Sequence, residues 1–157
     1  GSKSDYDYLA PACGMLTHLG IAYEAKVLSA HRTPDQTTEY AASAEKRGLF
    51  CIIAAAGGAA HLGGVIASKT ILPVLGVPIP STSLNGMDSL LSIVQMPPGI
   101  PVATFSIGKW GSTNAAIFAA QIIAAKHPEV REKLRAWRES RARDVLSQTL
   151  PQQVLPQ

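Results

Sequence analysis

Two histidines in short loops are the residues of this chain best suited to acid–base chemistry. His31 stands in the run SAHRTP, and His61 stands in the run GGAAHLGG. An imidazole gives and takes a proton near neutral pH, so either residue could serve as a general acid or base. Each could equally be a structural histidine bonded to a loop carbonyl, and the residue types alone leave both readings open.

Residues near these histidines could bind a phosphate and a sugar. Arg32 offers a planar fork of N–H donors that suits phosphate, although a surface salt bridge is an equal alternative. Hydroxyl donors come from Ser29 in the run SAHRTP and from Ser2 and Ser4 in the run GSKSD, which opens the sequence. Asp5 could accept hydrogen bonds from sugar hydroxyls. Together these residue types are compatible with a phosphorylated, sugar-bearing ligand.

The stretch 51–64 predicts a buried strand followed by a ligand-binding loop. Its first six residues, CIIAAA, form an apolar run that ends abruptly in glycine, as in a strand buried on both faces of a parallel sheet. The next residues, Gly57, Gly58, Ala59 and Ala60, have almost no side chain, so their backbone N–H groups can approach a ligand closely. A plain strand–loop–helix corner is the alternative interpretation.

Two other kinds of site lack support in the sequence. No spacing of His, Cys, Asp and Glu resembles a metal site, so we expect no metal. No G-x-G-x-x-G or P-loop pattern occurs, which argues against a dinucleotide or a nucleoside triphosphate.

The elements that must position these residues alternate between strand and helix. Hydrophobic periodicity and Gly/Pro punctuation predict helices over 6–19 (ended by Gly20), 34–48, 61–70, 87–96, 114–126 and 128–150, and strands over 22–28, 51–56, 73–77 (stopped by Pro78 and Pro80) and 102–107. Such alternation indicates an α/β fold with a parallel, doubly wound sheet. Ligands bind outside the carboxyl ends of such strands, so the loops GSKSD, SAHRTP and GGAAHLGG should meet at one edge.

Composition predicts one oligomeric domain. The chain has 157 residues, of which 46% are hydrophobic and only 16% charged, so we expect partner subunits to cover part of its surface. A net charge of +3 is too small to indicate nucleic acid. The basic last helix fits packing on a neighbouring subunit better than nucleic-acid binding. We therefore expect no nucleic-acid partner.

The cysteines and the hydropathy pattern predict a cytoplasmic protein. Cys13 and Cys51 lie in apolar segments and make no disulfide framework, which fits a reducing compartment. No apolar run approaches the roughly 20 residues of a membrane-spanning helix, and no signal peptide opens the sequence. We therefore expect no membrane partner.

Five runs together resemble the PurE family of class I N5-carboxyaminoimidazole ribonucleotide mutases. These are GSKSD, SAHRTPD, GGAAHL, PVLGVP and DSLLSIVQMPPGIPVAT, in this order, and the resemblance extends from Gly1 to about Leu146. It implies a flavodoxin-like, three-layer α/β/α domain over 1–157 with a tail at 151–157. It also implies a homo-octamer with active sites at subunit contacts and C-terminal helices packed on neighbours.

The resemblance implies an activity and a role for each site residue. The family moves a carboxylate from an exocyclic nitrogen to ring carbon C4 of an aminoimidazole ribonucleotide, without a cofactor. By this resemblance, Ser2 and Arg32 hold the 5′-phosphate, Asp5 holds the ribose, and His31 transfers the proton. The remaining expected substrate-binding residues are Ser4, Ser29, Ala30, Gly57, Gly58, Ala59, His61 and Leu62.

The sequence departs from the family pattern in three places. Where the family reads AGAGGAAHLPG, this chain has Ala55 at the second position and Gly63 in place of the proline. Glycine at position 63 should loosen the loop beside His61. The family also has a hydrophobic strand directly before GSxSD, so we expect the sequence to have lost such a strand.

Three alternative functions stay open from the sequence. Class II relatives carboxylate aminoimidazole ribonucleotide directly with carbon dioxide and carry lysine and glycine where this chain has Arg32 and Thr33, which favours class I. A catalytically weak ribonucleotide-binding relative is the second alternative. A flavodoxin-type electron carrier fits less well, because the loops lack the aromatic residues of a flavin site.

Overall fold

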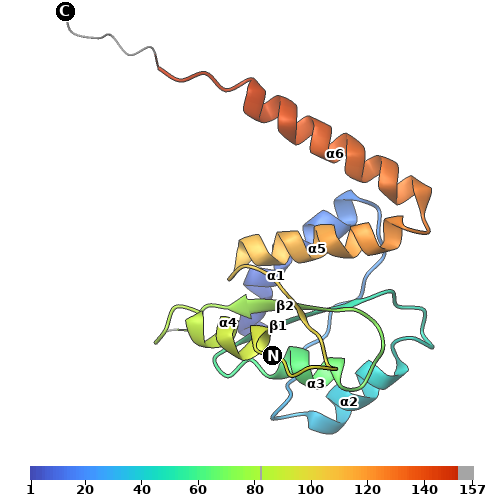
Figure 1. Ribbon diagram of the computed structural model, residues 1–157, viewed down its shortest axis with the longest axis vertical. Helices are drawn as coiled ribbons and strands as arrows, with labels where there is room; N and C mark the ends of the chain where they lie inside the picture. The colour runs from blue at the N-terminus through green and yellow to red at the C-terminus, as the bar shows by residue number, and fades with distance from the viewer. Residues whose placement is uncertain (82, 152–157) are drawn as a thin grey trace, which may run out of the picture.

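The computed structural model describes residues 1–81 and 83–151, and its elements form three layers with a parallel sheet between two layers of helices (Figure 1). In chain order the elements are a 3-10 turn (Lys3–Asp5), α1 (Tyr6–His18), α2 (Pro34–Ser43), β1 (Ile52–Gly57), α3 (Leu62–Ala67), β2 (Val74–Ile79), α4 (Met87–Val94), β3 (Ala103–Thr104), α5 (Lys109–Ala124) and α6 (Pro128–Leu146). This architecture confirms the predicted flavodoxin-like α/β class.

The sheet has the strand order β1-β2-β3, and both pairings are parallel. Ile52 lies opposite Val74, and Gly57 lies opposite Ile79. Successive residues of β1 face opposite layers, as strand geometry requires. Ala54 packs in the cluster that includes residues of α2, α3 and α4, whereas Ala55 packs in the cluster that includes residues of α1 and α5.

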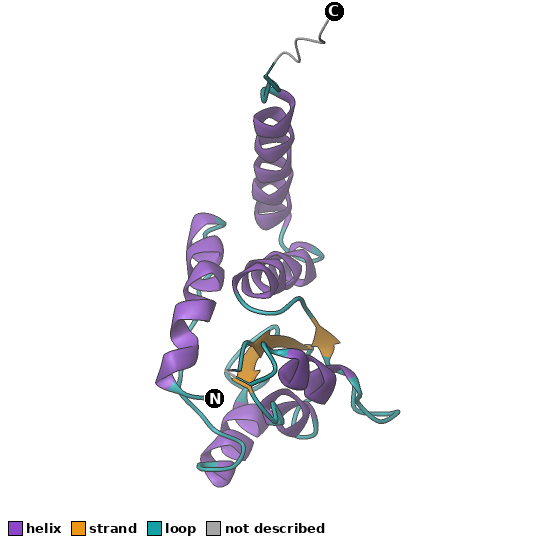
Figure 2. Cartoon of the chain, turned by 90° about the vertical axis from the view of Figure 1, so that its left-hand side faces the viewer, coloured by secondary structure: helices purple, strands orange, loops and turns teal. Residues whose placement is uncertain are grey.

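α1 is ended by a glycine, and the described residues of α6 are buried only in its first half. α1 ends in a Schellman motif: Gly20 has φ +70°, and the Ile21 N–H donates to the Leu16 carbonyl over 2.9 Å. This confirms Gly20 as the helix stop. α6 projects away from the sheet (Figure 2), and only Val130 and Leu134, both in its first half, are buried among its described residues.

The predicted strand over 22–28 is wrong. Among the described residues, this segment makes no backbone hydrogen bond to another strand, and it borders a cavity that β1 also lines. A strand requires a neighbour within hydrogen-bond reach, which hydrophobic alternation alone does not provide. Side chains hold the segment instead, because Glu24 pairs with Arg47, which stacks on the Tyr40 ring of α2.

Prolines and glycines explain further differences from the predicted elements. Pro78 lies within β2 and does not stop it. Its carbonyl accepts from Gly108 N–H over 2.8 Å, so its ring nitrogen faces the same side, beyond the end of β3, and removes no bond to β1. α5 begins at Lys109, where a turn was predicted. Gly111 is needed there for close packing and not for a turn, since a Cβ at this position would lie 1.6 Å from the Ser106 carbonyl oxygen.

Several elements are also shorter than predicted. α2 ends at Ser43, before Gly48; α3 ends at Ala67; and β3 has two residues in place of the six predicted over 102–107. The order of helices and strands is otherwise as predicted. In the part of the chain that the structure describes, no helix has the length and apolar character needed to cross a membrane.

Candidate functional site

The glycine loop after β1 places His61 at the carboxyl edge of the sheet. Gly58 turns the chain with φ +63°, a conformation that a residue without Cβ adopts at low cost. The His61 N–H then donates to the Ala59 carbonyl over 2.7 Å, and the His61 carbonyl accepts from Val65 over 3.0 Å. His61 is therefore the N-cap residue of α3, and its backbone is fixed.

The loop before α2 is closed by hydroxyl groups. The Thr33 N–H donates to the Ser29 carbonyl over 3.0 Å, and the Ser29 N–H donates to Thr33 Oγ1 over 2.8 Å. The fully buried Thr37 adds a bond from its Oγ1 to the Ser29 carbonyl over 3.2 Å. Sequence reasoning gave the two threonines no role, yet they set the geometry of this loop. The hydroxyls in the run T-P-D-Q-T, at the start of a helix, were the available signal.

The two loops bring the predicted histidines together. His31 Nε2 lies 2.9 Å from His61 Nδ1, and the two ring centroids are 5.0 Å apart with the planes at 80°. Both residues are exposed. Two groups capable of proton transfer therefore lie in contact, although they are 30 residues apart in the sequence.

The N-terminal turn lies beside the same edge, as predicted. The Gly1 amino nitrogen donates to the Ala55 carbonyl of β1 over 2.9 Å, and Arg32 Nη2 donates to the Gly1 carbonyl over 2.9 Å. Ser2 Oγ lies 2.6 Å from Ser4 Oγ. A guanidinium and two hydroxyls thus meet at one end of the site, and these are donors of the kind that bind phosphate.

Asp5 has a structural role besides the expected contact with a ribose. Its Oδ2 accepts from the Ser2 N–H over 2.9 Å and lies 3.2 Å from the Gly1 amino nitrogen. This oxygen therefore shapes the N-terminal turn. Oδ1 is the carboxylate oxygen that these contacts leave for another donor.

The other predicted site residues differ in exposure. Gly57 and Ala59 are exposed, and Ser29 also contacts Arg32, whose N–H lies 3.2 Å from Ser29 Oγ. Ala30 packs against the core, and Leu62 belongs to it with 7% of its surface exposed. The Leu62 side chain therefore points away from solvent and anchors the glycine loop.

Gly63 lies in the first turn of α3, where it is buried. A Cβ at this position would lie 3.5 Å from Val102 Cγ1, which is an ordinary packing distance. The position at which the family carries proline is thus a helical one in this chain, and proline is tolerated in a first helical turn.

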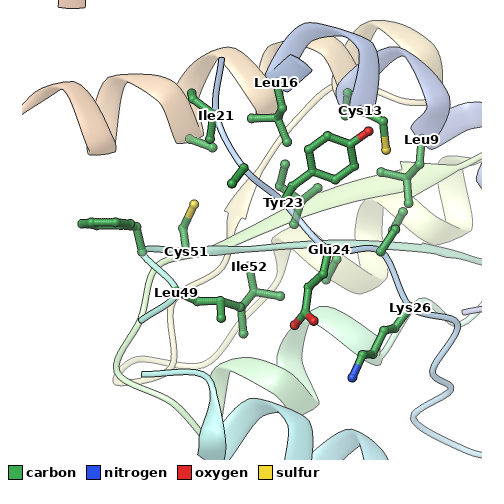
Figure 3. Close-up of a pocket in the computed structure, with 18 of the residues that line it drawn as sticks. Leu9, Cys13, Leu16, Ile21, Tyr23, Glu24, Lys26, Leu49, Cys51 and Ile52 are labelled. Carbon is green, nitrogen blue, oxygen red and sulfur yellow. The ribbon is translucent and has the colours of Figure 1, made fainter. Parts of the chain in front are cut away.

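One apolar cavity is separate from the paired histidines. It has a volume of about 900 Å³ and lies between α1, the segment 20–28 and β1, bordered by apolar side chains such as Leu9, Leu16 and Ile52 (Figure 3). Of the site residues, only Gly1, Ser2, Asp5 and Leu62 border it. Neither histidine does, so we assign the chemistry to the loop edge on the basis of side-chain chemistry rather than cavity size.

Residues 1–81 and 83–151 contain no group of three or more His, Cys, Asp and Glu side chains placed to hold a metal ion. What the described arrangement offers is a pair of imidazoles for proton transfer, a guanidinium with hydroxyls for an anion, and exposed backbone of the glycine loop.

Comparison with known proteins gives one consistent family. The family model described as AIR carboxylase matches residues 1–144. The chain is 58% identical over 151 residues to the N5-carboxyaminoimidazole ribonucleotide mutase of Pseudomonas aeruginosa, covering 96% of this chain and 93% of that protein. It is 51% identical to the protein of that name from Escherichia coli, covering 96% and 89%. The crystal structure of Treponema denticola PurE superposes with a TM-score of 0.81 at 28% identity, covering 93% and 90%.

Proposed function

The chain belongs to the AIR carboxylase family, and we propose that it is an N5-carboxyaminoimidazole ribonucleotide mutase of purine biosynthesis. The reaction moves the carboxylate of N5-carboxyaminoimidazole ribonucleotide to C4 and gives 4-carboxyaminoimidazole ribonucleotide. The chain and its relatives from Pseudomonas aeruginosa, Saccharolobus solfataricus and Bacillus subtilis, which carry this name, are 56–58% identical over most of both lengths.

The proposed reaction is an isomerisation without a net redox change. Protonation of the carbamate nitrogen breaks the N–C bond and releases carbon dioxide, which leaves an electron-rich aminoimidazole. C4 then attacks the retained carbon dioxide, a C–C bond forms, and the C4 proton leaves. Holding the gas molecule beside C4 gives it a high effective concentration. One imidazole can deliver the first proton and accept the second, so the protons balance.

The contact between His31 and His61 is the observation that carries this proposal. It places a ring nitrogen of His31 2.9 Å from a ring nitrogen of His61, at the edge where the glycine loop ends. In our proposal His31 transfers the proton, and the backbone of Gly57, Gly58 and Ala59 surrounds the imidazole and carboxylate of the substrate. No step needs a cofactor.

Polar groups of Arg32 and of the N-terminal turn support an assignment for the rest of the ribonucleotide. We assign the 5′-phosphate to Arg32 and Ser2, since Arg32 Nη2 donates to the carbonyl of Gly1, the residue directly before Ser2. Asp5 would bind the ribose through Oδ1, since Oδ2 is occupied within the turn. Ser4 and Ser29 would complete the polar side of the site, with Ala30 and Leu62 shaping its walls.

We further propose that the protein acts as a homo-oligomer, an octamer as in the family, with sites at subunit contacts. Exposed apolar residues support this, since Met87, Leu91 and Val94 form one stripe along α4 and are each about half exposed. Trp110 at the start of α5 is 83% exposed. The projecting α6 offers a further surface for a neighbour. Sedimentation or light scattering would measure the number of subunits.

The cytoplasm is the compartment that we propose for this enzyme. Cys13 and Cys51 are both free thiols, as expected in reducing surroundings.

The decisive experiment is an ultraviolet assay of the purified protein with 4-carboxyaminoimidazole ribonucleotide, followed in both directions. Equilibration with the N5-carboxylated isomer, with little effect of added bicarbonate, would support the mutase. Conversion only to aminoimidazole ribonucleotide and carbon dioxide would indicate direct carboxylase chemistry. Tight binding of the ribonucleotide by a folded protein, without turnover, would indicate a binding relative. Either of the last two results would overturn the proposal.

A further inference from the structure

The ring of His31 is less constrained than the loop that carries it. The backbone of residues 29–33 is held by hydrogen bonds from Thr33 and Thr37. Among the described residues, however, the imidazole of His31 makes a single hydrogen bond, from its Nε2 to His61 Nδ1. The orientation of this ring therefore depends on one neighbour.

That neighbour also has a fixed backbone. His61 stands between Ala60, which is 1% exposed, and Leu62, which is 7% exposed. Its backbone N–H and carbonyl are both engaged at the start of α3. Two anchored neighbours and two backbone bonds therefore fix the main chain of His61, from which its Nδ1 contacts the ring of His31.

We propose that His61 is a positioning residue for His31, an inference that rests on the proposed function. By engaging Nε2 of His31, His61 Nδ1 leaves the other ring nitrogen, Nδ1 of His31, as the one available to the substrate. A neutral imidazole has one N–H and one lone pair, and the bond at one nitrogen determines which of the two the other nitrogen presents.

This arrangement matters because the reaction uses one proton carrier twice. The nitrogen that delivers a proton to the carbamate must later accept the proton from C4. With Nε2 held by His61, the same atom, Nδ1 of His31, performs both transfers without a turn of the ring. His61 thereby acts through His31 and not on the reacting atoms.

Two substitutions at position 61 separate this role from simple space filling. In His61→Asn, the side-chain amide places an oxygen or an N–H near the position of Nδ1, so it can still accept from or donate to His31. His61→Leu has similar bulk and no polar atom. We expect His61→Leu to lower kcat on the order of a hundredfold with KM changed less than about threefold, as for a misplaced catalytic group. We expect His61→Asn to recover most of the lost kcat.

A matched control removes an imidazole elsewhere. His18→Leu, at the exposed end of α1, should leave both kcat and KM unchanged. An His61→Asn enzyme as slow as His61→Leu would overturn the proposal, and so would an His61→Leu enzyme of normal kcat.

Nitrogen-15 NMR of the substrate-free protein tests the contact without any assay. With labelled histidine at one fixed pH, His61→Leu should move the resonance of His31 Nε2 more than that of His31 Nδ1, and His18→Leu should move neither. An unchanged Nε2 resonance would overturn the proposal. If the wild-type protein failed to interconvert the two carboxylated isomers, the proposed function would fall while this spectrum still decided the His31–His61 contact.

Discussion

β1 borders two regions of opposite character. At its carboxyl end, the loops that carry His31 and His61 are closed by hydrogen bonds of 2.7–3.2 Å between residues close in sequence. Along its free edge lies an apolar cavity of about 900 Å³, opposite a segment that makes no ladder with it. The first region is fixed by polar contacts between residues close in sequence, whereas the segment of the second is held by the pair of Glu24 with the distant Arg47. The difference shows that a sheet can hold a well-defined site although one of its edges is unpaired.

The largest expected effect concerns the polar region. His31→Asn removes the proposed proton carrier and should lower kcat roughly 10²–10⁴-fold, while KM changes little because the anion-binding residues remain. The interconversion assay measures both constants, and His18→Asn is the control. Turnover near the wild-type rate would contradict the assignment of His31.

The apolar region should suppress the reactivity of a thiol. Burial raises the pKa of Cys51, which lines the cavity, from 9.0 to about 11. The thiolate fraction at mildly alkaline pH, and with it alkylation by iodoacetamide, should fall roughly a hundredfold relative to the unfolded chain. Mass spectrometry of the peptide containing Cys51 measures the rate. Equal rates for folded and denatured protein would mean that water fills the cavity.

The same pKa shift predicts the alkaline limit of stability. Because the folded state holds the Cys51 proton more tightly, this contribution is fully present below the unfolded pKa and is lost as the pH rises from about 9 toward about 11. Cys51→Ala should reduce that alkaline loss, which denaturant titrations at several pH values would show.

A smaller effect is expected from the hydroxyl that closes the site loop. Thr37→Val keeps the shape of the buried side chain but removes its bonds to the Ser29 and Thr33 carbonyls, at a cost of about 1 kcal/mol of unfolding free energy. Thr113→Val loses an exposed bond within α5 and should cost about 0.5 kcal/mol or less. Urea denaturation compares the two. An equal cost would indicate that the loop closure contributes no additional stability.

The smallest effect concerns the segment opposite β1. The hydrogen bond from Arg47 holds the pKa of Glu24 below its usual value of 4.5. Stability from this pair is therefore present above the unfolded pKa and lost as the pH falls through the lower, folded one. Glu24→Gln should slightly flatten the acid dependence of stability, as measured by thermal melts between neutral and acidic pH. An unchanged profile would show that solvent screens the pair fully.

The local part of this structure was predictable from the sequence. Gly20 ended α1 because a glycine there adopts φ +70°, and the small residues after β1 formed the expected loop. The meeting of His31 and His61 was predicted from the rule that parallel strands present their carboxyl ends at one edge, and it occurs although the segment before His31 forms no strand. These predictions depend on residue chemistry and on topology, both of which can be derived from sequence.

What failed was non-local. Whether 22–28 becomes a strand depends on a neighbour that its own residues do not specify, and Pro78 is tolerated in β2 only because of where β3 ends. The 2.9 Å distance between His31 Nε2 and His61 Nδ1 likewise depends on tertiary placement.

The free edge of β1 also has a consequence for handling the protein. Backbone groups of an edge strand next to apolar surface form a template onto which a strand of another chain can add. Because β1 has a strand neighbour on one side only among the described residues, the protein should associate progressively with concentration and time. Storage dilute and cold, or with a short capping peptide of alternating charged residues, is the practical remedy that this edge suggests.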